Sequence, residues 1–294
     1  MNIGLTIEQL ALFGITLLIV GYVVLGVMAL IPATRVISRE LIQIFFSATL
    51  IALVLISAGL LGTPGVVLLV TTIAFRVGYE ATQVRIGPGK PAWTGGLITT
   101  SICLAAMLDH RIAFAFVVVW PILLFRLAQK SSQGKNADIL DLLVFPILPM
   151  ALMTYGAVSE DLRVAIIGSY VLVEIFDSCA LLFGKLFGKR KAFPILSPRK
   201  TIEGLVGALA GMCTLTVIGA AWFNLWLPGL LAAAIAVAIL AVAGDLAASR
   251  LKRMAGIKDY PILLKHQGGL LDSLDSWLAA SAGLSIISFF IRLL

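Results

Sequence analysis

Charged residues are scarce in this chain. Only 13% of its 294 residues are Asp, Glu, Lys or Arg, whereas 60% are hydrophobic. The mean hydropathy of +1.07 is higher than a soluble domain tolerates. This composition excludes a soluble globular protein, and we expect an all-α, polytopic integral membrane protein.

Residues that build disulfides and zinc sites are also sparse. The three cysteines, Cys103, Cys179 and Cys213, are scattered along apolar segments, so neither a disulfide framework nor a zinc site is indicated. His266 is more typical of a loop hydrogen-bonding residue than of a lone metal ligand. The first residues, up to Glu8, lack the basic region of a signal peptide, which favours a retained first helix.

The net charge of +7 does not point to nucleic acid, because no motif combining aromatic and basic residues accompanies it. Anionic headgroups of membrane lipids and phosphate ligands explain the positive charge better.

Hydropathy marks about ten candidate membrane spans, each needing roughly 20 residues to cross the hydrocarbon core. The expected spans are residues 10–31, 41–61, 64–79, 94–108, 112–128, 139–158, 162–184, 203–223, 225–250 and 269–292. The third to fifth are short. Pro121, Pro146 and Pro149 lie inside spans, where we expect them to bend the helix and to leave carbonyls for neighbouring groups.

The distribution of lysine and arginine predicts the orientation. If the first span runs from outside to inside, the cytoplasmic side collects all 22 cations except Arg111, Arg163 and Arg292. Both termini then lie outside, and the loops at 185–202 and 250–268 face the cytoplasm.

The two halves of the chain differ in polar content. Residues 1–160 are interpreted as structural, lipid-facing helices, and the glycine-rich turn at 87–91 lacks the ending and the context of a phosphate loop. Residues 161–294 are interpreted as the catalytic region with its cytoplasmic loops.

In the second half, Asp177, Gly184 and Gly188 recur at helical spacing, so one helix face carries a carboxylate and then small residues. Ser197 and Thr201 are plausible helix caps. Arg199 and Lys200 lie just before the next helix, and a helix start with nearby cations attracts phosphate. For the helix of Asp177, the alternative is a packing face whose following cations, Lys185, Lys189, Arg190 and Lys191, only anchor it at the cytoplasmic headgroups.

The most polar stretch is 244–277. Asp245, Ser249 and Lys252 lie on one helical stripe, while Asp272 and Asp275 lie one turn apart on the final helix. Carboxylates from two helices near lysines suit Mg²⁺ bridging to the phosphates of a nucleotide triphosphate. A structural ion-pair network is the alternative.

These motifs resemble the signature of the phosphatidate cytidylyltransferases, the CDP-diacylglycerol synthases. The pattern S-x-x-K-R-x-x-x-x-K-D, followed by a glycine pair and D-x-x-D, is present at 249–275, and the blocks at 177–188 and 197–204 resemble that family's upstream motifs in the same order. The close resemblance covers about residues 165 to 294.

The resemblance implies an enzyme that transfers CMP from CTP to phosphatidate, giving CDP-diacylglycerol and pyrophosphate in phospholipid biosynthesis. It implies that Asp245 and Asp272 hold Mg²⁺, with room for a second cation. Together with the predicted orientation, it implies a bacterial inner (cell) membrane protein whose active site faces the cytoplasm. The implied catalytic residues are Asp245, Asp272, Asp275, Lys252 and Lys258. The implied substrate-binding residues are Asp177, Ser197, Lys200, Thr201, Glu203, Ser249, Arg253, Asp259, Gly268 and Gly269.

The sequence departs from the family pattern at two positions. Gln267 stands where the family has histidine, with His266 one residue earlier, and Ser273 stands where it has arginine. The acceptor therefore stays open between phosphatidate and another lipid phosphate, as does a homodimer. Two different functions also remain open: an ion-coupled transporter that uses the intramembrane carboxylates, and a catalytically impaired scaffold.

Overall fold

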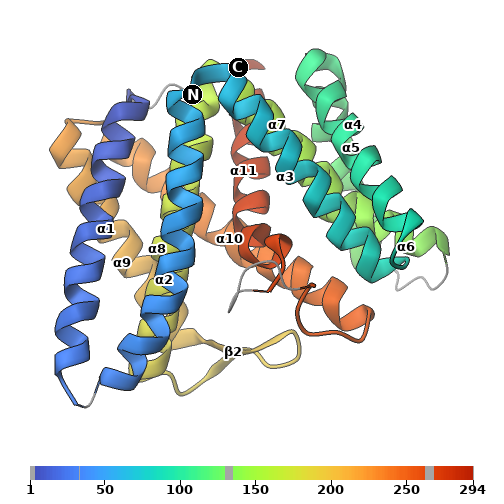
Figure 1. Cartoon of the computed structure of the whole chain (residues 1–294). Coiled ribbons are helices and arrows are strands. Elements are labelled where there is room, and N and C mark those ends of the chain that lie inside the picture. Colours follow the sequence, from blue (N-terminus) through green and yellow to red (C-terminus); the bar gives the residue numbers. More distant parts are fainter. Residues whose placement is uncertain (1–3, 33, 130–134, 262–267, 294) are drawn as a thin grey trace.

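The computed structural model describes residues 4–32, 34–129, 135–261 and 268–293. Over these residues the chain is almost entirely helical, as the composition predicts (Figure 1). The helices of the first half are α1 (Ile7–Leu30), α2 (Arg35–Leu60), α3 (Gly62–Arg85), α4 (Lys90–Leu108), α5 (His110–Gln129), α6 (Lys135–Leu142), the π-helical turn η1 (Leu143–Ile147) and α7 (Leu148–Val158). Those of the second half are α8 (Glu160–Phe187), α9 (Ile202–Phe223), α10 (Leu227–Met254) and α11 (Leu270–Leu293).

Within the described residues, nine helices are long and apolar enough to cross a membrane. The fifth predicted span falls on α5, whose described apolar part, His110–Leu123, is shorter than a span. The third prediction, 64–79, was too short, because α3 continues to Arg85. The chain is an integral membrane protein.

Prolines shape the segment between α5 and α7. Phe145, just before Pro146, has φ −153° and ψ 124°, so the helix is interrupted there as predicted. The indole Nε1 of Trp120 donates a 2.7 Å hydrogen bond to the carbonyl of Val144, which satisfies a backbone group at this interruption. Pro149 lies in the first turn of α7, where proline is tolerated, and therefore does not bend that helix.

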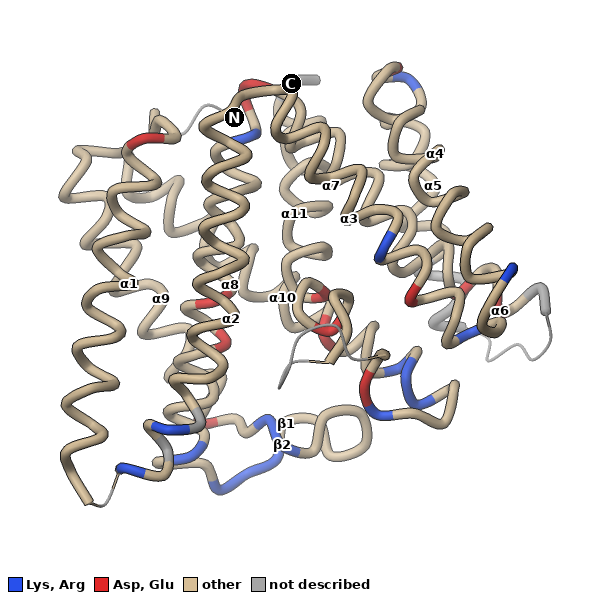
Figure 2. Tube along the Cα trace, in the orientation of Figure 1, with Lys and Arg blue, Asp and Glu red and all other residues tan. Residues whose placement is uncertain are grey.

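A short antiparallel hairpin, β1 (Lys191–Phe193) and β2 (Ser197–Thr201), joins α8 to α9. The all-α prediction did not include it. Figure 2 shows lysines and arginines gathered around this hairpin and the segment after α10, while α1 begins and α11 ends at the opposite end of the molecule. This charge separation matches the one predicted from the loops.

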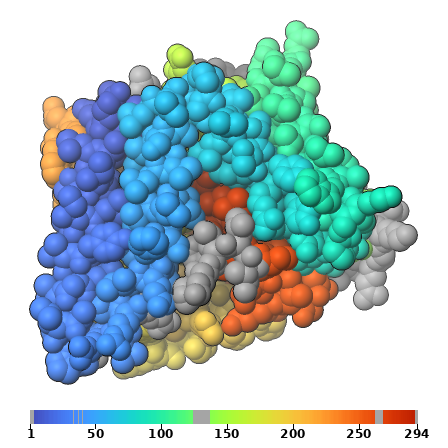
Figure 3. Space-filling view, in the orientation of Figure 1, coloured from blue at the N-terminus to red at the C-terminus, as the bar shows by residue number. Residues whose placement is uncertain are grey.

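The final helix, α11, lies inside the bundle, and its central side chains are buried. Trp277 anchors it to α8, because the indole Nε1 donates to the carbonyl of Ile166 at 2.9 Å and lies 3.1 Å from Ser169 Oγ. In Figure 3, red-orange atoms of the C-terminal helices lie in a recess bordered by blue and cyan atoms of the first half. Both halves of the chain therefore surround the helix that carries Asp272 and Asp275.

Candidate active site

Close packing of α8 against α9 fixes one side of the site. Gly184 faces Thr201 and Gly204, and a Cβ built on Gly184 would lie 3.2 Å from Thr201 Oγ1. Thr201 caps α9 as predicted, because its Oγ1 accepts the N–H of Gly204 at 3.1 Å. Ser197, the other predicted cap, lies instead within β2, paired with Phe193. The capping prediction was wrong there, because strand pairing, not a helix start, occupies that position.

Lys200, at the end of β2, connects α8 to α10. Its Nζ lies 3.1 Å from Asp245 Oδ2 and 3.9 Å from Asp177 Oδ1, and only 20% of its side chain is exposed. Burial alone would lower the pKa of this ammonium group, but the nearby Asp177 and Asp245 carboxylates outweigh burial and raise the pKa above its usual value. Lys200 therefore carries a positive charge at neutral pH.

Asp275 joins this group because α10 and α11 are in close contact. A Cβ built on Gly244 would lie 2.5 Å from the backbone oxygen of Asp275, so only a glycine permits this separation. The Asp275 side chain is buried, and the charges of Asp177, Lys200 and Asp245 act on it. We call Asp177, Asp245 and Asp275 the carboxylate cluster; Lys200 is its central cation.

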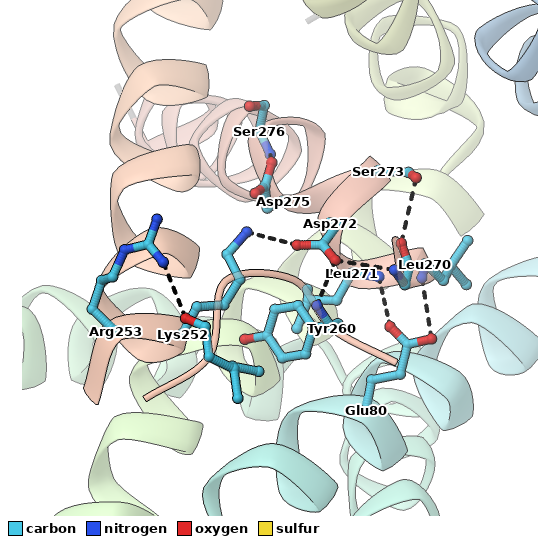
Figure 4. Close-up of polar contacts among 12 residues, drawn as sticks. Glu80, Lys252, Arg253, Tyr260, Leu270, Leu271, Asp272, Ser273, Asp275 and Ser276 are labelled. Carbon is cyan, nitrogen blue, oxygen red and sulfur yellow. Dashed lines mark hydrogen bonds and ion pairs between the residues drawn. The ribbon is translucent and has the colours of Figure 1, made fainter. Parts of the chain in front are cut away.

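Asp272 lies on the same helix but has a different set of partners (Figure 4). Its Oδ1 accepts a 2.6 Å hydrogen bond from the ammonium of Lys252, and its Oδ2 accepts the backbone N–H groups of Tyr260 at 2.7 Å and Gly269 at 3.0 Å. Lys252 also lies 5.6 Å from the centre of the Tyr260 ring. Burial, and then the charge of Asp272, raise the pKa of the Tyr260 phenol, which stays neutral.

The carboxylate oxygens of this site suit a hard cation, but the two predicted ligands, Asp245 and Asp272, are not equally free to bind one. Asp245 Oδ2 is buried and, among the described residues, accepts no hydrogen bond of ordinary geometry, so it has lone pairs available for a metal. Asp272 has three hydrogen bonds already, which leaves it fewer. The described residues contain no group of three His, Cys, Asp or Glu side chains arranged around one point. Mg²⁺ commonly binds with one or two carboxylates plus substrate phosphates, and the cluster fits that mode.

The remaining predicted residues lie around these two groups. Ser249 is buried on α10, whereas Arg253, Lys258 and Asp259 are exposed at the end of α10 and in the segment after it. Lys265, His266 and Gln267 lie outside the described residues.

Glu203 lies in the first turn of α9 and holds the hairpin. Its carboxylate accepts the backbone N–H groups of Lys189 at 3.0 Å and Arg190 at 3.1 Å, and also the side chain of Arg190. Its predicted role in binding substrate stays a prediction, because these contacts are all within the protein.

One acidic residue near the site was missed from the sequence. Glu80 of α3 is buried and accepts the backbone N–H groups of Leu270 and Leu271, at the start of α11 (Figure 4). The signal was the spacing of Arg76 and Glu80, four residues apart on one helix face at the end of a predicted span, where an uncompensated charge is costly.

An apolar cavity of about 450 Å³ leads to the carboxylate cluster. It lies between α1, α2 and α8 and is lined mainly by aliphatic side chains, including Leu18, Leu41 and Ala48. Tyr170, Glu174 and Asp177 also line it. Asp177 is 42% exposed because its side chain borders this space. The cavity thus places an acyl-sized apolar volume next to charged groups.

Comparison with known proteins gives consistent matches. The model of the cytidylyltransferase family matches residues 10–291. The chain is 37% identical over 141 residues to a phosphatidate cytidylyltransferase of Staphylococcus haemolyticus (strain JCSC1435), covering 46% of this chain and 53% of that protein. It is 37% identical over 139 residues to the protein of the same name in Staphylococcus aureus (strain COL), covering 45% and 52%.

The chain thus spans about half the length of the curated relatives it matches. The names of these relatives agree with the motif resemblance and give no support to an ion-coupled transporter. The family match covers nearly all of the chain, including every helix of the site. The chain belongs to the cytidylyltransferase family.

Proposed function

We propose that this protein transfers CMP from CTP to a lipid phosphate, phosphatidate foremost, giving CDP-diacylglycerol and pyrophosphate for phospholipid biosynthesis. The observation that carries the proposal is that Asp177, a member of the carboxylate cluster 3.9 Å from Lys200 Nζ, also lines the apolar cavity. A lipid phosphate needs both environments within one molecule's length: an apolar space for acyl chains and a charged site for its phosphate.

In the proposed reaction, an oxygen of the lipid phosphomonoester forms a bond to the α-phosphorus of CTP. The bond from that phosphorus to the bridging oxygen breaks, and pyrophosphate leaves. A phosphomonoester with a second pKa near 6 is already largely dianionic at neutral pH, so no strong general base is needed. Positioning and charge stabilisation supply the catalysis.

The cations of this chain then bind the phosphates. Lys200 is held in place by Asp177 and Asp245, and Lys252 by Asp272, so both ammonium groups are fixed before substrate arrives. Exposed Arg253 lies at the end of α10 and exposed Lys258 in the segment after it, where they would meet the outer phosphates of the triphosphate. Preorganised charges of this kind act without the cost of reorientation during the reaction.

Mg²⁺ is the proposed cofactor, with room for a second cation. Bound there, it would neutralise the negative charge that converges on the α-phosphate. Asp245 offers the carboxylate oxygen Oδ2, which lies 3.1 Å from Lys200 Nζ in an ion pair without ordinary hydrogen-bond geometry, and Asp275 lies close enough for its charge to interact with that of Asp245. Asp272 is the further predicted ligand.

We further propose that the protein lies in a bacterial inner membrane with its active site facing the cytoplasm. Lysines and arginines gather at the end that carries the hairpin, and such residues are retained on the cytoplasmic side (Figure 2). CTP would enter from that side, while the acyl chains stay in the cavity between α1, α2 and α8.

The test is a panel of acceptors. Purified protein is incubated with CTP, Mg²⁺ and, separately, phosphatidate, lysophosphatidate, an ether-linked phosphatidate and a polyprenyl phosphate, and pyrophosphate release is measured. We expect the fastest release with phosphatidate. Faster pyrophosphate release with another lipid phosphate would identify that lipid as the acceptor in place of phosphatidate. It would agree with the presence of Ser273 where the family has arginine. Light scattering of the detergent-solubilised protein tests the predicted homodimer separately.

A further inference from the structure

The start of α11 is held by a side chain from the other half of the chain. Glu80 on α3 is fully buried, and its two carboxylate oxygens accept one backbone N–H each: Oε1 from Leu270 at 3.1 Å and Oε2 from Leu271 at 2.9 Å (Figure 4). The first N–H groups of a helix have no partner within the helix and form its positive end. A carboxylate in this position satisfies two of them at once.

The surroundings of Glu80 are built for this contact. Arg76, one turn earlier on α3, places its Nε 2.6 Å from Glu80 Oε1 and balances the buried charge. A Cβ built on Gly269 would lie 2.6 Å from Glu80 Oε2, so a larger residue at 269 would displace the carboxylate. Glycine at this position is therefore explained by the approach of Glu80, and also by Tyr260, whose Cβ would lie 2.7 Å from the same added Cβ.

Glu80 and Asp272 divide the first amides of α11 between them. Asp272 accepts the N–H of Gly269, and Glu80 accepts those of Leu270 and Leu271. Three consecutive backbone N–H groups therefore donate to two carboxylates. With both oxygens engaged, Glu80 restrains the rotation of α11 about its axis and its displacement along that axis at the end of the helix that carries Asp272 and Asp275. The rotation of α11 determines where Asp272 and Asp275 point, because both side chains project from its first two turns.

We propose that Glu80 is a positioning residue for nucleotidyl transfer. By holding the start of α11, it determines the direction in which the Asp272 and Asp275 side chains point, and it does not contact substrate. The proposal rests on the proposed function. It assigns the N-terminal half a part in positioning the catalytic groups, where the sequence indicated only structural helices. A displacement of about 1 Å in catalytic groups lowers rates by on the order of a hundredfold.

The experiment compares Glu80→Leu and Glu80→Gln with the wild type. Leucine keeps the size and removes both acceptors, and glutamine keeps one carbonyl oxygen. For CMP transfer to phosphatidate, we expect kcat to fall about 100-fold in Glu80→Leu and about 10-fold in Glu80→Gln, with the KM for CTP changed less than about threefold. Amide hydrogen exchange should accelerate in the peptide that contains Leu270 and Leu271.

Asp141→Asn is the matched control. Asp141 is also a buried carboxylate of the first half paired with an arginine, at 2.8 Å from Arg85, but it lies on α6. Thermal unfolding is measured for every variant, and kcat is expressed per folded molecule. We expect Asp141→Asn to lose stability, to keep kcat within about twofold of the wild type and to leave exchange at Leu270 unchanged.

The proposal is overturned if Glu80→Gln keeps a wild-type kcat, or if Asp141→Asn lowers kcat as much as Glu80→Gln does. If Glu80→Leu does not fold, Glu80→Gln decides by the same criteria. Absence of CMP transfer by the wild-type protein is a different result, which would contradict the proposed function instead. Unchanged amide hydrogen exchange at Leu270 and Leu271 in Glu80→Gln would show that Glu80 does not hold these two amides, and it overturns the proposal whatever the activity.

Discussion

Replacing Lys252 with Met removes the ammonium that bonds Asp272 Oδ1 at 2.6 Å and keeps most of the side-chain length. The two side chains are only 11% and 7% exposed, so water has little access to the carboxylate that remains. Breaking a buried ion pair by removing one partner costs about 3–5 kcal/mol. Asp272 keeps two backbone N–H donors, from Tyr260 and Gly269, which stabilise its charge. We therefore expect the lower end, about 3 kcal/mol.

A loss of about 3 kcal/mol raises the unfolding equilibrium constant roughly a hundredfold, since about 1.4 kcal/mol corresponds to tenfold. The assay is reversible unfolding in mixed micelles, with Arg253→Met as the control. Arg253 is the neighbouring residue, is exposed and donates to the carbonyl of Ile257, so its loss should change stability by about 0.5 kcal/mol or less. In a double-mutant cycle with Asp272→Asn, we expect a coupling of at least about 1 kcal/mol. Equal effects of the two single substitutions, or no coupling, would refute this reasoning.

Three further outcomes are expected. Asp245→Asn removes an anionic ligand but keeps its size, so turnover should fall at least about 100-fold while the protein still folds; unchanged turnover would argue against Asp245 as a ligand. Ala48→Phe places a ring in the cavity and should raise the KM for phosphatidate about tenfold or more, with the KM for CTP unchanged; equal changes in both constants would contradict an acyl-chain site. Gln267→His combined with Ser273→Arg should increase CMP transfer to phosphatidate severalfold if drift alone explains these residues, whereas lower activity would indicate adaptation to another lipid phosphate.

The helices were predictable because each must offer the membrane a long apolar run, which a sequence displays directly. The end of α3 was not predictable in this way, because Arg76, Glu80 and Arg85 lower the hydropathy of that segment. Their charges are compensated within the protein, by the Arg76–Glu80 pair and by the 2.8 Å contact of Arg85 with Asp141. A hydropathy scale gives each residue the free-energy cost of entering the membrane alone. It takes no account of an oppositely charged partner elsewhere in the protein.

The candidate site was predictable as far as local spacing reaches. The stripe through Asp245, Ser249 and Lys252, and the single face shared by Asp272 and Asp275, follow from helical periodicity. Helical periodicity does not predict which lysine contacts which aspartate, because those contacts depend on how the helices pack.

The contact between Glu80 and Leu270 spans 190 residues of sequence, and no local pattern encodes it. The hairpin was missed for a related reason. Strands of three and five residues bury too little to leave a clear pattern, and Ser197 before a helix is typical of a cap.

The central claim is that this chain breaks CTP between its α and β phosphates and joins the CMP to a lipid. The most direct measurement gives the purified protein phosphatidate and Mg²⁺ with CTP labelled either at the α or at the γ phosphate, and then separates lipid from water-soluble products. We predict that the α label enters the lipid and that the γ label appears in pyrophosphate, in equal amounts. Neither label in the lipid and no pyrophosphate, with phosphatidate or any other lipid phosphate, would contradict the account.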